Sequence, residues 1–268
     1  MLMNVWITGA SSGIGQATAY SFASRGHRVI LTALEAPELY TTAEECRKKG
    51  APDVKCLPFN LLDTKDIPAL AEQAWNAFEG GVDVLYCNAG ISQRTNVMDT
   101  DEAMIRKIME LNYFSPVLLA KEILPRMLAR EPKDGIRGQI AVTTSINGRF
   151  GFPLRCGYSS SKHALYGFFE TLAAEYYDQG IRVTIVCPGR VQTNISFFAL
   201  EKGGKQHGKL DAGQASGLTA DKAGEKICKA ILARKREVLV GRKELLMVYI
   251  KRFFPGLCAK LSRKIEPM

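Results

Sequence analysis

Tyr158 and Lys162 are the two residues whose types and spacing most directly suggest chemistry. Side chains four positions apart share one face of a helix and approach each other. A free tyrosine has a pKa of about 10 and exchanges protons poorly at neutral pH, but a neighbouring ammonium group favours the phenolate and lowers that pKa. The pair therefore predicts a general acid or base. The alternative is a helix whose solvent-exposed polar face carries both residues, which would show the same spacing.

Ser145 follows an apolar run at 140–144 and supports this interpretation. The end of a strand and the start of the next helix converge at the ligand edge of an open α/β sheet. A hydroxyl at that place can hold a substrate oxygen within reach of Tyr158. Considered by itself, Ser145 would be a turn or capping residue.

A glycine-rich turn connects an apolar run at Asn4–Thr8 with a helical stretch at 14–24. Such a turn can bring backbone N–H groups at a helix N-terminus to a dinucleotide pyrophosphate. Glycine permits positive φ and lacks the Cβ that would keep the phosphate away. An ordinary flexible turn is the alternative, but the position in the first βα unit favours the dinucleotide. The residues expected to contact it are Gly9, Ser11, Ser12, Gly13, Ile14 and Gly15.

Apolar runs and chain breakers predict strands that alternate with helices. The predicted strands are 4–8, 28–32, 54–57, 82–86, 139–144 and 182–186, and the predicted helices are 14–24, 37–49, 63–78, 99–130, 158–178 and one from about 219. This alternation implies right-handed βαβ units and a parallel sheet covered on both faces. We therefore predict the α/β class, with a Rossmann-like doubly wound parallel sheet of about seven strands and helices on both faces.

A doubly wound sheet binds its ligand beyond the carboxyl ends of its strands, so the loops after those ends should hold the site. No linker divides the chain. Residues 1–242 are expected to form a single dinucleotide-binding and catalytic domain, with a substrate lid at about 190–219. Residues 243–268 are expected to form an apolar and basic C-terminal extension.

The composition, with 46% hydrophobic and 24% charged residues, is typical of a globular protein. No leader segment precedes the first apolar run, and no apolar run approaches the roughly 18 residues that a membrane-spanning helix needs. The seven cysteines are scattered, without the spacings of a metal site or a disulfide framework. We expect a cytoplasmic protein with reduced thiols and no metal site.

Residues 201–268 contain 16 Lys and Arg and 7 Asp and Glu, and so carry the whole net charge of +9. No nucleic-acid partner is expected, because the chain has no basic stripe with interleaved aromatic residues and no recognisable binding module. The tail at 245–265 mixes apolar and basic residues, a composition suited to a membrane interface. Peripheral membrane contact at the membrane surface is therefore one prediction, and a flap over the substrate pocket or a partner subunit is the other.

Together these features resemble the short-chain dehydrogenase/reductase family over nearly the whole chain. The matching motifs are the turn TGASSGIG at 8–15, Asn88-Ala89-Gly90, Asn112, Ser145, Tyr158 with Lys162, and Pro188-Gly189 with Thr193. The segment 208–218 and the apolar, basic C-terminus are similar to a branch that includes hydroxysteroid dehydrogenases and the dehydrogenase/reductase member 7 group.

The resemblance implies an NAD(P)-dependent oxidoreductase that transfers a hydride between a nicotinamide ring and a carbonyl or secondary alcohol. It implies that Tyr158 exchanges the proton together with Ser145. Lys162 would also bind the nicotinamide ribose, and Asn112 would hold a water that links the lysine to solvent. The other cofactor-binding residues that it implies are Asn60, Leu61, Asn88, Ala89, Gly90, Pro188, Gly189, Val191 and Thr193. It further implies a homo-oligomer, a dimer or tetramer, paired through the helices at 99–130 and 158–178.

Two departures from the family pattern leave the choice between NADP and NAD open. Ala33 stands where an acid would accept from the ribose 2′-OH of NAD, and Leu34 stands where NADP enzymes carry Arg. Ser12 also lacks the basic side chain often found in NADP-binding turns. We favour NADP, because no acid at this position would repel its 2′-phosphate. Asn60 replaces the usual Asp near the adenine and retains a hydrogen-bonding group.

Five apolar residues flank the predicted catalytic edge: Phe150, Phe152, Leu154, Phe197 and Phe198. They predict a pocket for a lipophilic carbonyl or alcohol substrate, with packing in the core or in loops as the alternative. A catalytically idle dinucleotide-binding sensor or scaffold would need only the glycine turn, and a methyltransferase gives no reason for the Tyr158 and Lys162 pair.

Overall fold

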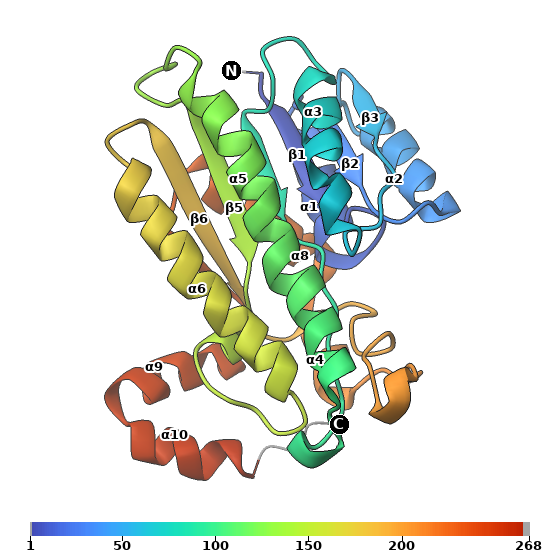
Figure 1. Cartoon of the computed structure of the whole chain (residues 1–268), viewed down its shortest axis with the longest axis vertical. Coiled ribbons are helices and arrows are strands. Elements are labelled where there is room, and N and C mark those ends of the chain that lie inside the picture. Colours follow the sequence, from blue (N-terminus) through green and yellow to red (C-terminus); the bar gives the residue numbers. More distant parts are fainter. Residues whose placement is uncertain (1, 265–268) are drawn as a thin grey trace.

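The computed structural model describes residues 2–264 and contains a central sheet of seven parallel strands (Figure 1). Their order in the sheet is β3-β2-β1-β4-β5-β6-β9. The strands are β1 (Asn4–Thr8), β2 (Arg28–Thr32), β3 (Val54–Cys56), β4 (Val84–Cys87), β5 (Gly138–Thr143), β6 (Ile181–Pro188) and β9 (Glu237–Val240). This is the doubly wound order, in which the chain reverses direction across the sheet between β3 and β4.

Helices cover both faces of this sheet, as the βαβ pattern requires. They are α1 (Gly13–Ala23), α2 (Pro37–Lys48), α3 (Ile67–Asn76), α4 (Glu102–Met109), α5 (Ser115–Leu128), α6 (Cys156–Tyr176) and α8 (Ala220–Leu232). Neighbouring strand residues point to opposite faces, so Val5 and Ile7 pack under α1, α2 and α8, whereas Trp6 packs under α3, α5 and α6. Both sides of each central strand are buried, which explains the nearly continuous apolar runs in the sequence.

Two smaller units extend from the carboxyl edge of the sheet. One is the segment 190–219, in which β7 (Val191–Gln192) pairs with β8 (Leu218–Thr219) and the short α7 (Ala212–Ala215) lies between them. The other is the tail, with α9 (Leu246–Phe253) and α10 (Pro255–Ser262). Within residues 2–264, no helix has the length and apolar character that crossing a bilayer requires. Ile265, the last residue of the apolar and basic stretch considered above, lies outside the described residues.

The predicted fold class and strand alternation are confirmed, with two differences in detail. The helix predicted at 99–130 consists of α4, a π-helical turn at Glu110–Phe114 and α5. Pro116 lacks the backbone N–H that would bond to the carbonyl of Asn112 four residues earlier, and this missing bond accounts for the irregular turn. The seventh strand, β9, was not located from the sequence, because its four residues follow the polar segment 234–236 and begin with an exposed glutamate.

Helix α8 lies directly against the backbone of α1, and Gly224 makes this approach possible. A Cβ on Gly224 would lie 2.4 Å from the carbonyl carbon of Ala17. Gly167, on an exposed turn of α6, has open space around it. The two glycines therefore differ in what an added methyl group would meet.

Gly224→Ala should lower the free energy of unfolding by about 1–3 kcal/mol, because α8 must move away from α1. Gly167→Ala should raise it by about 0.5–1 kcal/mol, because alanine restricts the unfolded chain without a clash. Urea unfolding followed by circular dichroism measures both. Equal effects of the two substitutions would contradict the close packing of α1 and α8.

Candidate active site

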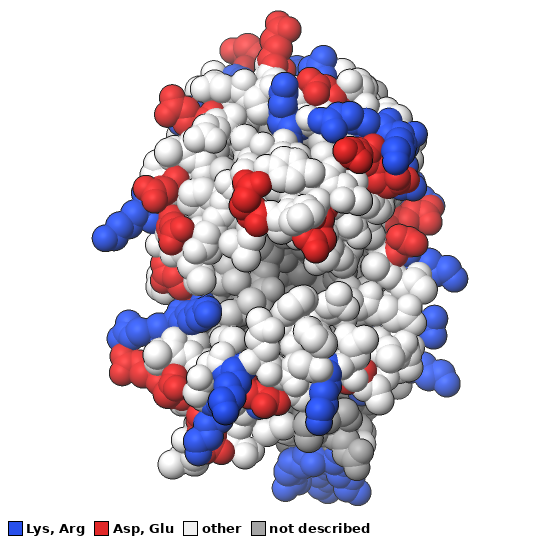
Figure 2. Space-filling view, turned by 90° about the vertical axis from the view of Figure 1, so that its right-hand side faces the viewer, with Lys and Arg blue, Asp and Glu red and all other residues white. Residues whose placement is uncertain are grey.

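The carboxyl ends of the central strands open into two adjoining pockets, and Figure 2 shows one side of the molecule hollowed, with mostly uncharged atoms around the hollow. The glycine-turn pocket is lined by Gly9, Ser11, Ser12, Gly13, Ile14, Asn88, Ala89, Gly90, Ile91, Thr143, Tyr158, Lys162, Thr193, Asn194, Ile195 and Phe198. The lid pocket is lined by residues from the ends of β5 and β6, from the loop after β4, from α6 and from the segment 190–219, among them Ser145, Pro188, Gly189, Val191 and Thr193. Tyr158 lines both pockets and stands at their boundary.

The glycine turn has the form of an anion cradle. Gly9 and Gly13 have φ values of +64° and +57°, which L residues rarely adopt. A Cβ on Gly15 would lie 2.1 Å from the Gly9 carbonyl oxygen. Ser12 precedes α1 in an extended conformation and makes no capping hydrogen bond through its side chain. The first N–H groups of α1 therefore have no side-chain partner, an arrangement that fits a pyrophosphate.

Asn88 ties the glycine turn to the ends of two other strands. Its backbone N donates to Thr8 Oγ1 at 3.0 Å, and its Nδ2 donates to the Thr8 carbonyl at 3.3 Å. Its Oδ1 accepts from Thr143 Oγ1 at 3.1 Å. A Cβ on Gly9 would lie 2.9 Å from the Cα of Ala89. The ends of β1, β4 and β5 are thus held together by one amide side chain and one close backbone contact.

Tyr158 and Lys162 lie one turn apart on α6, and the structure brings Ser145 to them from the end of β5. All three side chains are buried. Lys162 Nζ donates to the Thr143 carbonyl at 2.9 Å and lies 5.7 Å from the centre of the Tyr158 ring. The predicted grouping of Tyr158, Lys162 and Ser145 at the carboxyl edge is therefore present.

The ionisation of this group differs from the prediction. Burial raises the pKa of Tyr158, although its hydrogen bond with Ser145 and the charge of Arg94 oppose that shift. Burial also lowers the pKa of Lys162 to about 7. The predicted lowering of the Tyr158 pKa by Lys162 is therefore not found. The reason is that both groups are removed from water, and desolvation disfavours the charged form of each.

Asn112 lies in the π-helical turn and is buried. Its Nδ2 donates to the Ile91 carbonyl at 2.9 Å and to Ser161 Oγ at 3.1 Å, and its Oδ1 accepts from the Ile91 N–H at 2.9 Å. A Cβ on Gly90 would lie 3.0 Å from Asn112 Oδ1 and 3.5 Å from Lys162 Nζ. The amide thus fixes the chain after β4 beside the lysine.

Of the other predicted cofactor residues, most line one or both pockets and two line neither. Ala89 and Gly90 line the glycine-turn pocket, Thr193 lines both pockets, and Pro188, Gly189 and Val191 line the lid pocket. Asn60 and Leu61 line neither. Asn60 Oδ1 accepts from the Leu62 N–H at 3.2 Å, and Leu61 is packed in the core. Ala33 is buried and Leu34 is exposed. Neither side chain is charged, so neither can accept from a ribose 2′-OH or pair with a 2′-phosphate.

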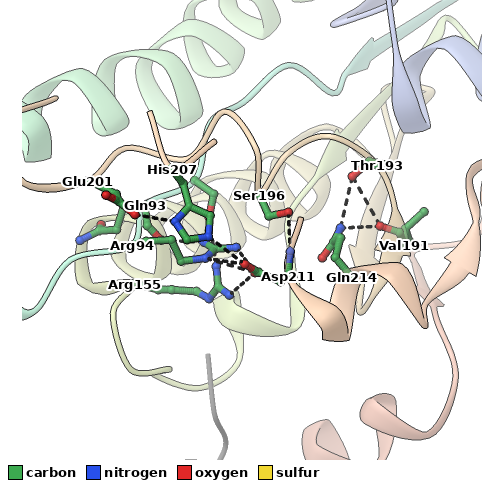
Figure 3. A network of polar contacts seen from close by, with 11 residues as sticks. Gln93, Arg94, Arg155, Val191, Thr193, Ser196, Glu201, His207, Asp211 and Gln214 are labelled. Carbon is green, nitrogen blue, oxygen red and sulfur yellow. Dashed lines mark hydrogen bonds and ion pairs between the residues drawn. The ribbon is translucent and has the colours of Figure 1, made fainter. Parts of the chain in front are cut away.

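A buried polar network that sequence reasoning missed holds the segment 190–219 against the rest of the molecule (Figure 3). Asp211 forms an ion pair with Arg94, from the loop after β4, and accepts from Arg155 at 3.3 Å. The two arginines also donate to Ser92 Oγ, at 2.9 Å and 3.3 Å. His207 Nε2 lies 3.4 Å from Asp211. No local sequence pattern could reveal a pair separated by 117 residues.

The base of the segment 190–219 is clamped where β7 meets β8, with Val191 opposite Leu218. Inside the loop, Gln214 Nε2 donates to the Val191 carbonyl and to Thr193 Oγ1, the latter at 3.2 Å (Figure 3). This clamp joins the two ends of the segment, and the Asp211 network anchors its interior to Arg94 and Arg155.

The five apolar residues predicted to form the substrate pocket do not stay together. Phe152 lines the lid pocket and Phe198 lines the glycine-turn pocket. Phe150 is buried in a core cluster beneath the tail. Leu154 and Phe197 line neither pocket. Leu154 has φ +61°, a strained conformation for this residue. In the sequence it lies between Phe152 and Arg155, which belongs to the Asp211 network.

The tail makes a polar contact with this region through Glu244. Its Oε1 accepts from the backbone N–H of Arg190 at 2.8 Å and of Arg242 at 3.1 Å. A Cβ on either Gly189 or Gly241 would lie 2.4 Å from this oxygen. No described tail residue lines the lid pocket; helices α9 and α10 instead support its wall from behind, through the cluster that includes Phe150.

Comparison with known families and curated proteins gives one consistent result. The family profile described as short chain dehydrogenase matches residues 3–202. Dehydrogenase/reductase SDR family member 7B of Bos taurus is 35% identical over 263 residues, which cover 96% of this chain and 79% of that protein. Dehydrogenase/reductase SDR family protein 7-like of Drosophila melanogaster is 35% identical over 270 residues, which cover 98% and 81%.

Solved structures agree in fold. An alcohol dehydrogenase from Thermococcus sibiricus, complexed with 5-hydroxy-NADP, has a TM-score of 0.75 at 25% identity and covers 91% of this chain and 98% of its own. A short chain dehydrogenase/reductase from Burkholderia phymatum, in complex with NAD, has a TM-score of 0.80 at 23% identity and covers 100% and 96%. The second likeness is one of fold alone.

The buried Lys162 predicts a specific pH dependence of stability. Its pKa falls from 10.5 to about 7 on folding, so between these values the unfolded chain binds more protons and stability rises with pH. The free energy of unfolding of the wild type should therefore rise relative to Lys162→Met as the pH increases from about 7 to about 10.5. Parallel curves from urea unfolding across this range would contradict the buried, neutral lysine.

Proposed function

The chain belongs to the short-chain dehydrogenase family, and from this premise we propose that it is an NAD(P)-dependent oxidoreductase acting on a carbonyl or secondary alcohol. The observation that carries the proposal is the position of Tyr158, which lines both pockets and contacts Ser145. One pocket offers a helix N-terminus to a dinucleotide, and the other offers room for a substrate on the far side of the phenol. A bound nicotinamide supplies or accepts the hydride.

The residues of the chain handle the proton and the orientation of the substrate. Tyr158 exchanges a proton with the substrate oxygen, and Ser145 holds that oxygen by a hydrogen bond. Because burial raises the pKa of Tyr158, its phenol keeps its proton at neutral pH and can donate to a carbonyl oxygen. Lys162 faces the glycine-turn pocket, where it can bind ribose hydroxyls, and Asn112 fixes the chain beside it.

Backbone N–H groups at the start of α1 would hold the pyrophosphate of the dinucleotide, and the glycines of the turn leave room for it. Asn88 positions this turn, while Thr193 and the Pro188-Gly189 turn border the two pockets near Tyr158. Of the two dinucleotides we propose NADP, because neither Ala33 nor Leu34 carries an acid that would repel the 2′-phosphate. Parallel assays with NADPH and NADH measure this preference.

We further propose that residues 1–242 act as one domain with a mobile substrate lid at 190–219. The pairing of β7 with β8 closes the two ends of the lid on each other. The lid contacts the loop after β4 through the Asp211 network and through backbone hydrogen bonds between Leu200 and both Ser92 and Arg94, and these are the contacts that opening would break. Ile146, Phe152 and Ile195 line the lid pocket and support a lipophilic substrate. Homo-oligomers would form through the exposed sides of α5 and α6, and sedimentation velocity measures their size.

Tyr158→Phe should bind NADPH as tightly as the wild type but lower kcat by about 10²–10⁴-fold, because it removes the hydroxyl group that exchanges the proton and leaves the ring in place. Lys162→Ala should weaken both binding and turnover. Reduced-nicotinamide absorbance over a panel of ketones and alcohols measures turnover, and NADPH fluorescence measures binding. The control is Tyr177→Phe, at the end of α6 and outside both pockets. Wild-type turnover in Tyr158→Phe would refute the role assigned to Tyr158, whereas no turnover by the wild type over the whole panel would favour an idle dinucleotide sensor.

The tail supports a second proposal, that this otherwise cytoplasmic protein lies on anionic membrane surfaces. Leu246, Tyr249, Phe253, Phe254 and Leu257 are exposed on α9 and α10. Basic residues accompany them on the same two helices: Lys251, Arg252 and Lys260. Exposed aromatic side chains with basic neighbours are the pattern of helices that lie in a lipid interface.

Replacing Phe253 and Phe254 together by serine should reduce co-sedimentation with vesicles that contain phosphatidylserine, because the apolar contribution to binding is lost. The matched control replaces Val97 and Met98 by serine, since these apolar residues are even more exposed than Phe253 and Phe254 but lie far from the tail in the sequence. Equal recovery of both variants with the vesicles would exclude the membrane contact.

A further inference from the structure

Positively charged side chains outnumber negatively charged ones on the wall of the lid pocket. Arg94, Arg155 and Arg190 line it together with a single carboxylate, Asp211. Asp211 is engaged by two of these arginines, through the ion pair with Arg94 and the 3.3 Å contact with Arg155. The carboxylate of Asp211 therefore balances charge on Arg94 and Arg155, and Arg190 is the remaining arginine on this wall.

Arg190 is built into the wall rather than extended into solvent. Its carbonyl oxygen would lie 2.4 Å from a Cβ on Gly217, and its guanidinium carbon 2.9 Å from a Cβ on Gly213. The two glycines thus allow the lid to close over this side chain. The backbone N–H of Arg190 is fixed by Glu244 at 2.8 Å. Both the backbone and the lid therefore restrict where the guanidinium can lie.

The Arg190 guanidinium makes no hydrogen bond and no ion pair with any residue in the described range, 2–264. Arginine is rarely left without a partner away from bulk water, because its five donors need acceptors. Its planar fork matches a carboxylate or a phosphate, which accept two parallel hydrogen bonds. A partly buried, unpaired guanidinium on a pocket wall is thus a recognition group for an oxyanion.

The location assigns this oxyanion to the substrate and not to the dinucleotide. Arg190 lines the lid pocket but not the glycine-turn pocket, which has its own anion cradle at the start of α1. Tyr158 and Ser145 line the same pocket as Arg190, with Phe152 on its wall. The pocket therefore offers a proton-exchanging phenol, an apolar surface and a cation to one molecule.

We propose that the substrate is an amphiphilic ketone or secondary alcohol that carries a carboxylate or phosphate, and that Arg190 binds this anionic group. The inference rests on the proposed function, because it places the reacting oxygen at Tyr158. Arg190 then determines specificity by holding the far end of the substrate. A neutral analogue would bury the guanidinium without an acceptor, which makes the preference for the anion large.

The test compares straight-chain keto acids and keto phosphate monoesters with the neutral methyl esters of the same keto acids. In the wild type, kcat/KM should be about tenfold to a hundredfold higher for an anionic ketone than for its neutral ester, the range expected of a hydrogen-bonded charged pair. Arg190→Met should abolish this preference through KM, and Arg190→Lys should restore part of it. Arg106→Met, an exposed change on α4 with the same loss of charge, should leave the preference intact.

Separate measurements distinguish failure of this inference from failure of the proposed function. If no ketone is turned over in a Tyr158-dependent manner, the proposed function fails, and calorimetric binding of the keto acid to the wild type and to Arg190→Met still decides the role of Arg190. Turnover that depends on Tyr158 but favours the ester would overturn the inference. A loss of NADPH affinity in Arg190→Met would also overturn it, because the guanidinium would then serve the cofactor.

Discussion

The close approach of the first strand, the first helix and the end of β4 is the constraint on which the site depends. Gly15 lies against the Gly9 carbonyl, and Gly9 lies against the backbone of Ala89. Any side chain at these glycines would force the helix away from the sheet. The same contacts leave the N–H groups of α1 pointing into a pocket and bring Asn88 to Thr143, whose carbonyl holds Lys162. Backbone geometry at one corner thus sets the position of the ammonium group on a distant helix.

Desolvation governs the chemistry of the group that this geometry assembles. Burial shifts both Tyr158 and Lys162 toward their neutral forms, because it raises the pKa of the phenol and lowers the pKa of the lysine to about 7. A site of this kind responds strongly to charge brought into it, since burial weakens the screening that water would provide. An anionic ligand beside Lys162 would raise the lysine pKa again, and the restored ammonium would then act on the phenol as the spacing of the two residues suggests.

Much of this arrangement can be predicted from sequence, because it follows from local rules. Alternating strands and helices determine a parallel sheet, and a parallel sheet places the ends of β1, β4, β5 and β6 at one edge, so Ser145 and Tyr158 must meet there. Burial is not a local property, which is why the direction of the Tyr158 pKa could not be obtained from the lysine four residues away. The pairing of Arg94 with Asp211 depends on the path of a long loop. The π-helical turn was available in principle from Pro116, whose missing N–H lies one turn after Asn112.

The contact between Glu244 and the Arg190 backbone adds a hydrogen bond to the apolar packing that joins the tail to the wall of the lid pocket. Glu244 lies two residues before the start of α9, so its carboxylate can transmit a shift of the tail helices to the turn after β6. Energetic coupling between two binding events is reciprocal. A ligand that moved the tail helices on binding would therefore change the affinity of the lid pocket through this contact, and occupancy of the pocket would change the affinity of the tail by the same factor.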